Sequence, residues 1–169
     1  MSLRIQSVSY SNWIDVPSPV GLIRVFEHNG KLYTLNIAVS KATKGKTQES
    51  KLLLEAKEQI DAYFSGKLKK FSLPVDLSSG TAFQQEVWKQ ISKIPFGKTV
   101  SYVDIAKAIG RPKAARAVGG AVGANPVPLI VGCHRVMGSS GKITGYSGGK
   151  GIPTKKWLLK HENIATSDS

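Results

Sequence analysis

The sequence is short of cysteine, of acidic residues and of long apolar segments. One Cys among 169 residues permits neither an internal disulfide nor a zinc site built from several thiolates. Such a chain needs no oxidising compartment, so we expect a cytoplasmic protein. Asp and Glu number 11 against 24 Lys and Arg, which gives a net charge of +13. An excess of this size favours a polyanionic partner, most often nucleic acid, although an ordinary basic surface gives the same numbers.

Neither a membrane segment nor a metal site is indicated. No apolar run approaches the length of a membrane span, and residues 1–6 lack the apolar core of a signal peptide. The Cys and the three His (His28, His134 and His161) are scattered without ligand spacing, so we expect no metal. Apolar residues make up 41% of the chain, which is enough for a hydrophobic core in one domain or two small lobes.

The first part of the chain predicts strands and one helix. Residues 13–16, 22–27 and 32–37 read as strands, and Asn29-Gly30 is a hairpin signal between the last two. Apolar residues at helical spacing predict a helix over 49–65, with Gly66 placed to end it. Ser78-Ser79-Gly80 is the predicted hinge. It divides the chain into an N-terminal lobe, 1–78, and a C-terminal lobe, 79–169.

The second part predicts short helices. Thr81 and Ser101 each begin a capping box, and Pro112 suits the first turn of a helix that runs to about residue 122. Two short helices joined by a Gly-containing turn form a helix-turn-helix pattern. The second of them contains Gly119 and Gly120, each of which costs about 0.5–1 kcal/mol relative to Ala. Close approach to a DNA backbone and tight packing inside the lobe explain these glycines equally well.

Cys133 is the candidate nucleophile. A free thiol has a pKa near 8.5 and needs a neighbouring base or cation to become reactive. His134 is next in sequence, but adjacent side chains in an extended segment point in opposite directions, so contact needs a turn near Gly132 or a water relay. A third group should orient the His, and Glu162 and Asp104 both qualify by residue type. An inert buried cysteine is the alternative.

Six motifs follow one another in the second part of the chain. They are GKTVSY at 97–102, AARAVG at 114–119, NPVP at 125–128, CHRV at 133–136, YSGG at 146–149 and WLLKHE at 157–162. This ordered series resembles the O6-alkylguanine-DNA alkyltransferases, the methylated-DNA–protein-cysteine methyltransferases. The match covers about residues 81–162, and the first lobe is similar only through its strands and the PSPVG run at 17–21.

The resemblance implies an α+β protein with a ribonuclease-H-like N-terminal lobe and a helical C-terminal lobe that carries a helix-turn-helix. It implies direct DNA repair, in which Cys133 irreversibly takes an alkyl group from O6 of a flipped guanine, with O4-alkylthymine as a further candidate. Each molecule would act once and need no cofactor. The implied partner is alkylated double-stranded DNA, and we expect a monomer that associates with the nucleoid when bound to DNA.

The resemblance also implies a role for each site residue. His134 is the base acting through water, Glu162 orients it, and Tyr102 donates a proton toward the leaving guanine. Arg116 enters the stack where the base has left. The implied catalytic set is Cys133, His134, Glu162, Asn125 and Tyr102; the substrate-binding set is Tyr146, Ser147, Gly148 and Val136; the DNA-binding set is Arg116, Lys113, Ala115, Gly119 and Arg135.

Two features depart from the family pattern. Gly132 stands where the family usually has Pro, and this glycine would loosen the chain before Cys133. The segment at 150–154 is slightly longer than the corresponding segment usually is in the family. Among other readings, a lesion-binding alkyltransferase-like protein would lack the cysteine. A helix-turn-helix regulator leaves the Cys-His run without a purpose, and the usual signatures of a cysteine hydrolase are missing.

Overall fold

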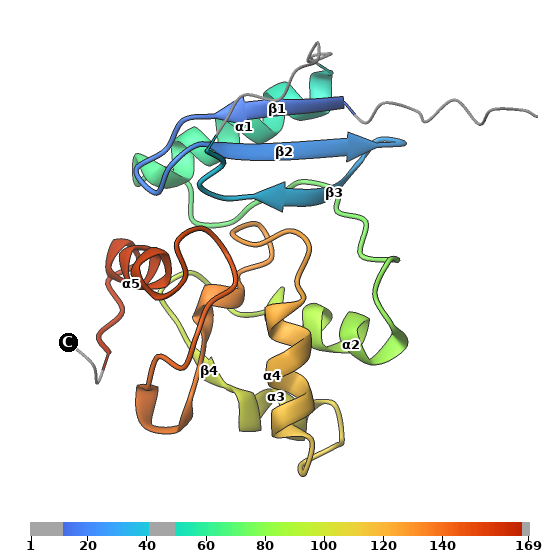
Figure 1. Cartoon of the computed structure of the whole chain (residues 1–169), viewed down its shortest axis with the longest axis vertical. Helices are drawn as coiled ribbons and strands as arrows, with labels where there is room; N and C mark the ends of the chain where they lie inside the picture. Colours follow the sequence, from blue (N-terminus) through green and yellow to red (C-terminus); the bar gives the residue numbers. More distant parts are fainter. Residues whose placement is uncertain (1–11, 41–49, 167–169) are drawn as a thin grey trace, which may run out of the picture.

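The computed structural model describes residues 12–40 and 50–166, which form a sheet lobe and a helical lobe (Figure 1). The first lobe is an antiparallel sheet in the order β1 (Asn12–Val16), β2 (Ile23–His28) and β3 (Lys31–Asn36), with helix α1 (Lys51–Phe64) across one face. The second contains α2 (Ala82–Ile91), α3 (Tyr102–Ala108), α4 (Ala115–Gly123) and α5 (Ile152–His161). The molecule is thus an α+β protein, as expected.

The hairpin between β2 and β3 forms where the sequence predicts it. Asn29 and Gly30 have φ angles of 50° and 74°, so both central residues of the turn are left-handed, which matches the twist of the flanking strands. The inward-facing apolar residues of the sheet pack against α1. They are buried together in one core: Ile14, Val16, Ile23, Val25 and Leu35 from the strands, with Leu53, Ala56 and Ile60 from the helix.

Helix α1 begins and ends close to the predicted positions. The Ser50 side chain caps it by accepting a hydrogen bond from the Leu53 N–H at 3.1 Å, and Gly66 follows the last turn with a φ of +79°. The predicted first residue, Glu49, lies outside the described residues. The fourth buried position of the helix is Tyr63.

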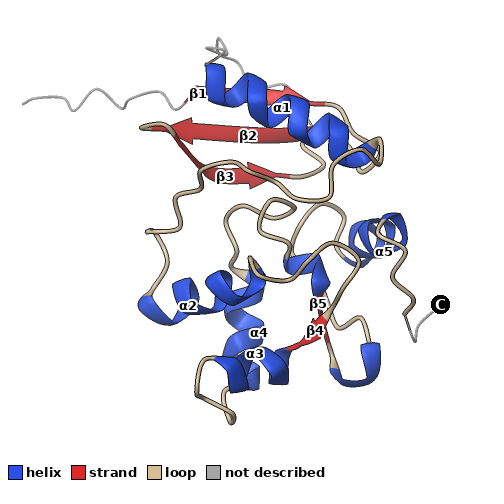
Figure 2. Cartoon of the chain, turned by 180° about the vertical axis from the view of Figure 1, so that it is seen from behind, coloured by secondary structure: helices blue, strands red, loops and turns tan. Residues whose placement is uncertain are grey.

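The outer edge of β3 connects the lobes. The Leu32 N–H donates to the Pro74 carbonyl at 2.9 Å, and the Leu35 N–H donates to the Pro126 carbonyl at 2.9 Å. The Thr34 hydroxyl bonds the same Pro126 oxygen. Because Pro126 belongs to the second lobe, that lobe is hydrogen-bonded to the sheet edge, and it lies beneath β3 in both views (Figures 1 and 2).

The helical lobe follows its capping signals, with one correction. Thr81 and Ser101 form the two predicted capping boxes at the start of α2 and α3. The prediction that Pro112 starts the next helix is wrong: α4 starts at Ala115, because a turn closed by the Ala114 N–H and the Arg111 carbonyl comes first. Helices α3 and α4 pack against each other.

A short parallel pair fixes the geometry of the lobe. Strand β4 (Val100–Ser101) pairs with β5 (Val136–Met137), so Val100 lies beside Val136. This ladder brings the start of α3 next to the segment that carries the only cysteine. In the described part of the chain, no helix is both long and apolar enough to cross a membrane.

Candidate active site

Cys133 lies on a tight turn at the base of a cleft. It begins a 3₁₀ helix, Cys133–Arg135, in which the Arg135 N–H donates to the Gly132 carbonyl at 3.0 Å. Cys133 is only 2% exposed, but it lines a cavity of about 840 Å³. The sequence predicted that contact between Cys133 and His134 needs either a turn near Gly132 or a water relay. A turn is present at that position.

Asn125 holds the segment before the cysteine. Its Nδ2 donates to the Val131 carbonyl at 2.8 Å, and its Oδ1 accepts from the Val127 N–H at 3.0 Å. A single buried amide thus ties both ends of a turn of the chain, which positions the backbone leading to Cys133. This arrangement agrees with the supporting position expected for Asn125.

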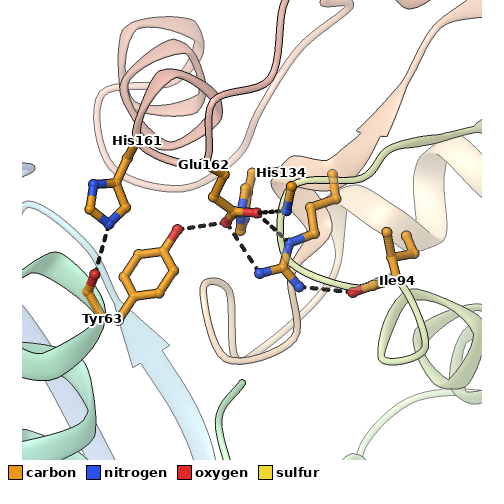
Figure 3. A network of polar contacts seen from close by, with 7 residues as sticks. Tyr63, Ile94, His134, His161 and Glu162 are labelled. Carbon is orange, nitrogen blue, oxygen red and sulfur yellow. Dashed lines mark hydrogen bonds and ion pairs between the residues drawn. The ribbon is translucent and has the colours of Figure 1, made fainter. Parts of the chain in front are cut away.

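His134 pairs with Glu162 in the interior. Their Nε2 and Oε2 atoms are 2.5 Å apart, and both side chains are fully buried (Figure 3). Since Nε2 faces a carboxylate, this nitrogen carries the proton and Nδ1 is the free lone pair. Nδ1 has no hydrogen-bond partner among the described residues. Asp104, the other candidate, instead caps α3 through the Ser101 N–H at 2.8 Å.

Glu162 is surrounded by donors. Its Oε1 accepts from the Gly97 N–H at 3.0 Å and from Arg135 Nε at 2.8 Å. Its Oε2 accepts from His134, from the Tyr63 hydroxyl at 2.6 Å and from Arg135 Nη2 at 3.2 Å. Burial acts to raise the pKa of Glu162, but these bonds and charges outweigh burial and hold that pKa well below its usual range. The carboxylate is therefore ionised at neutral pH.

The pKa values of His134 and Cys133 are shifted in opposite directions. Burial lowers the pKa of His134, although Glu162 partly opposes this, so the imidazole is neutral at pH 7 and able to accept a proton. Burial raises the pKa of the Cys133 thiol, while Asn125, Lys155 and Tyr146 nearby act to lower it. The resting sulfur is thus a thiol that needs a base, and a neutral base is next to it in sequence.

Lys155 is a buried cation of the site. Its Nζ donates to the carbonyls of Val136 at 2.6 Å and Gly145 at 3.2 Å. Burial lowers its pKa to about 8, and a negative charge on Cys133 would raise it. Because an ammonium favours a nearby thiolate, Lys155 can stabilise the charge that develops on sulfur.

Expected DNA and substrate residues form the walls of the cleft. Arg116 on α4 and Tyr102 at the start of α3 lie on its rim and walls, and the Tyr102 oxygen accepts a hydrogen bond from the Thr144 hydroxyl at 3.0 Å. Ser147 fixes the opposite loop by donating to the Gly123 carbonyl at 2.8 Å. The predicted site residues that line the cleft are Tyr102, Ala115, Arg116, Gly119, Cys133, Tyr146 and Ser147.

Four of the predicted substrate- and DNA-binding residues do not line the cleft: Lys113, Gly148, Val136 and Arg135. Lys113 is exposed just before α4 and does not line the cleft. Gly148 also lies outside the lining, but a Cβ there would come within 2.9 Å of the Tyr146 ring, so its small size lets that ring reach its place. Val136 is buried in β5 and meets the site through its carbonyl, which Lys155 binds.

The expectation that Arg135 contacts DNA needs correction. The residue is 8% exposed, and its guanidinium is bound to Glu162 and to the Ile94 carbonyl at 2.9 Å. A cation that is held by a buried carboxylate is not available to a phosphate on the surface. Arg135 is therefore part of the buried network around Glu162 and His134.

The glycines of α4 are not required by packing inside the protein. A Cβ on Gly120 would meet nothing within 4 Å, and one on Gly119 would meet only the Tyr102 ring, at an ordinary 3.9 Å. Arg116, Ala117 and Gly120 are exposed on this helix. Of the two explanations offered by the sequence, tight packing within the lobe is thus disfavoured, and an external surface that approaches the helix closely is favoured.

Sequence reasoning missed two buried polar residues of the site. Lys155 shares a helix face with Leu158 and Leu159, so its place in the apolar stripe of α5 was the available signal. Tyr63 lies on the buried stripe of α1, but no sequence signal connects it to a carboxylate 99 residues away.

Both lobes match one known family. Residues 13–77 match the ribonuclease-like domain, and residues 82–164 the DNA-binding domain, of 6-O-methylguanine DNA methyltransferase. The chain belongs to the 6-O-methylguanine DNA methyltransferase family. The ordered motifs in the sequence predicted this family, and the matches confirm it.

Relatives within this methyltransferase family cover most of the chain. A methylated-DNA–protein-cysteine methyltransferase of Mycolicibacterium paratuberculosis is 44% identical over 150 residues, which span 87% of this chain and 89% of the relative. One of Methanosarcina barkeri is 50% identical over 115 residues, or 68% and 71% of the two chains.

A solved structure agrees over nearly the whole length. The crystal structure of the Mycobacterium tuberculosis OGT in complex with DNA is 43% identical, with a TM-score of 0.80 over 93% of this chain and 96% of that one. The crystal structure of the O6-methylguanine methyltransferase from the same organism gives a TM-score of 0.79 at 42% identity, over 94% and 96% of the two chains. The fold of this methyltransferase is therefore an established α+β arrangement.

Proposed function

We propose that this protein repairs alkylated DNA by moving the alkyl group from O6 of guanine to Cys133. One observation carries the proposal: the cysteine at the base of an open cleft is followed by a neutral histidine that a buried carboxylate orients. Membership of the methyltransferase family and the names of relatives that act on methylated DNA support the same reaction.

The chemical step is a displacement at carbon. Cys133 Sγ attacks the alkyl carbon, a C–S bond forms, and the bond between that carbon and O6 of guanine breaks. The thiol proton goes to His134 Nδ1 through one water molecule, while Tyr102 protonates the leaving guanine. Tyr102 then regains a proton, so the net change is one thiol proton delivered to guanine. Glu162 stabilises the imidazolium that forms meanwhile.

The product explains why each molecule acts once. A thioether has no good leaving group and no oxyanion to stabilise, so water cannot release the alkyl group under ordinary conditions. No cofactor takes part, because the alkyl group and the proton go directly between protein and base. The protein is consumed in stoichiometric amounts.

Helix α4 suits a bent or opened duplex. The O6 atom lies inside the stack, so the nucleotide must be extruded at a cost of a few kcal/mol. In this proposal Arg116, which lines the cleft, enters the gap, where its flat guanidinium stacks on bases. The small residues on the exposed face of α4 let a minor-groove backbone approach, and Lys113 adds a phosphate contact. In this reading α3 and α4 act as the helix-turn-helix.

The finer expectations belong to the same proposal. The first lobe is the ribonuclease-H-like one, with the lobes divided at about residue 78. Tyr146, Ser147 and Gly148 hold the base and the alkyl group, and the DNA is double-stranded. The protein acts as a monomer in the cytoplasm.

Intact-mass spectrometry tests the proposal. After incubation with an O6-methylguanine duplex, the protein should gain the mass of one methylene, on the peptide that contains Cys133, and the gain should stop at one per molecule. Cys133→Ala should gain nothing yet still bind the duplex. A protein that stays unmodified while the lesion persists would leave only lesion binding, and a second turnover would exclude the stoichiometric mechanism.

A further inference from the structure

The hydroxyl of Tyr63 comes from the first lobe but reaches the carboxylate at the centre of the site. It donates to Glu162 Oε2 at 2.6 Å, and both side chains are buried. Figure 3 shows the tyrosine pointing at the carboxylate from α1, while His134 contacts it from the second lobe. Among the described residues, it is the one donor to Glu162 that lies before residue 78.

The Tyr63 ring is held from several sides. Ring centroids of Phe71 and Phe96 lie 5.4 Å and 6.1 Å from its own. The Tyr63 carbonyl accepts a hydrogen bond from His161 Nε2 at 2.7 Å. Two consecutive residues, His161 and Glu162, are thus bound to one residue of α1, so the hydroxyl has a fixed position relative to the carboxylate.

The shared oxygen connects Tyr63 to the base. Oε2 of Glu162 accepts from both Tyr63 and His134, so a donor on that oxygen withdraws negative charge from the histidine's partner. The other charged groups that act on His134 are Arg135 and Lys155. Burial, together with the charge of Glu162, raises the pKa of Tyr63, so its hydroxyl stays protonated and continues to donate.

We propose that Tyr63 is a positioning residue for alkyl transfer, which fixes the orientation and charge of Glu162 and thereby the basicity of His134. The inference rests on the function proposed above, because it concerns the base that takes the proton from Cys133. It makes the first lobe a working part of the site in addition to a support for the DNA-binding lobe.

Tyr63→Phe tests the hydroxyl while keeping the ring. The assay is alkylation of Cys133 by free O6-benzylguanine, followed by intact mass from about pH 5.5 to 9. Without this donor, Oε2 becomes more negative and favours the imidazolium of His134. We expect the acid limb of the rate profile to move up by about half a pH unit, with a loss that approaches about threefold only below the midpoint of that limb. The matched control, Tyr33→Phe on β3, should leave the profile unchanged.

Two further variants separate positioning from structure. Replacing Tyr63 by 3-fluorotyrosine keeps the fold and strengthens the donor, so the acid limb should move down. His161→Phe removes the hydrogen bond to the Tyr63 carbonyl but none to Glu162, so it should lower the melting temperature without moving the limb.

The outcomes distinguish this inference from the proposed function. If the wild-type protein reacts and both changes at Tyr63 leave the acid limb in place, the positioning role is wrong and the repair function stands. A limb that moves equally in His161→Phe would also overturn the role, since loosening of the lobe contact would then explain it. If the wild-type protein itself takes up no benzyl group, the function and the inference fail together.

Discussion

Replacing Glu162 by Gln removes a buried charge without changing the shape of the side chain. If the amide NH₂ takes the place of Oε1, it faces Gly97 N–H and Arg135 Nε, neither of which can accept a hydrogen bond. If it takes the place of Oε2, His134 can change tautomer and Tyr63 can rotate its hydroxyl to accept. The second orientation is therefore preferred, and only Arg135 Nη2 is then opposed.

The expected cost follows from this orientation. One buried donor without a partner costs about 1–3 kcal/mol, and breaking a buried ion pair about 3–5 kcal/mol. Because His134 and Tyr63 can adapt, we take the lower end, about 3 kcal/mol in the free energy of unfolding. In a chain of this size each kcal/mol lowers the melting temperature by about 2–4 °C, which gives a decrease of roughly 6–12 °C.

Differential scanning calorimetry at pH 7 measures the change. The control is Glu58→Gln on the exposed face of α1, which should stay within about 0.5 kcal/mol of the wild type. A decrease below about 2 °C for Glu162→Gln would refute the argument, because it would mean that Arg135 and the other donors do not depend on the carboxylate charge.

Three more predictions concern acid, the buried cation and the cleft rim. The hydrogen-bond partners of Glu162 keep its pKa below the value in the unfolded chain. The stability that this carboxylate contributes is therefore present above the ordinary Glu pKa and is lost as the pH falls. The difference in melting temperature between wild type and Glu162→Gln should narrow from pH 7 to about pH 3. Lys155→Met should raise the pKa of the Cys133 thiol, seen as a later rise in thiolate absorbance, and slow its alkylation by O6-benzylguanine; an unchanged titration would show that the ammonium does not act on sulfur. Arg116→Ala should slow repair in duplex DNA by roughly tenfold or more while the reaction with free O6-benzylguanine stays nearly unchanged, and equal losses would contradict the stack-filling role.

Local chemistry made much of the fold predictable. Asn29-Gly30, the two capping boxes and Gly66 each specify a backbone conformation within a few residues, and the chain adopts all of them. The prediction from Pro112 was wrong because Pro is suited both to the first turn of a helix and to an ordinary turn that precedes a helix. Residue propensity cannot choose between these two conformations when the flanking residues favour both of them.

Residue type and spacing predicted the kinds of groups in the site, but only the resemblance to the family named Glu162 as the partner of His134. Spacing could not choose between Asp104 and Glu162, because the choice depends on how α5 packs beside the cysteine turn. For the same reason Arg135 was assigned to the surface, although the tight turn at Cys133 directs it inward to Ile94 and Glu162. Long-range packing decides which charges meet, and the local sequence carries little of that information.

The hydrogen bonds between Tyr63 and the end of α5 make the chain suitable for division into two fragments. A cut between Gly66 and Thr81 would place that tyrosine on one fragment and Cys133 on the other. The second fragment alone would expose one side of the Glu162 carboxylate to water, and reassociation would cover it again. The pH dependence of labelling of the sulfur by a benzyl donor would then change when the two fragments meet, so that it reports their association.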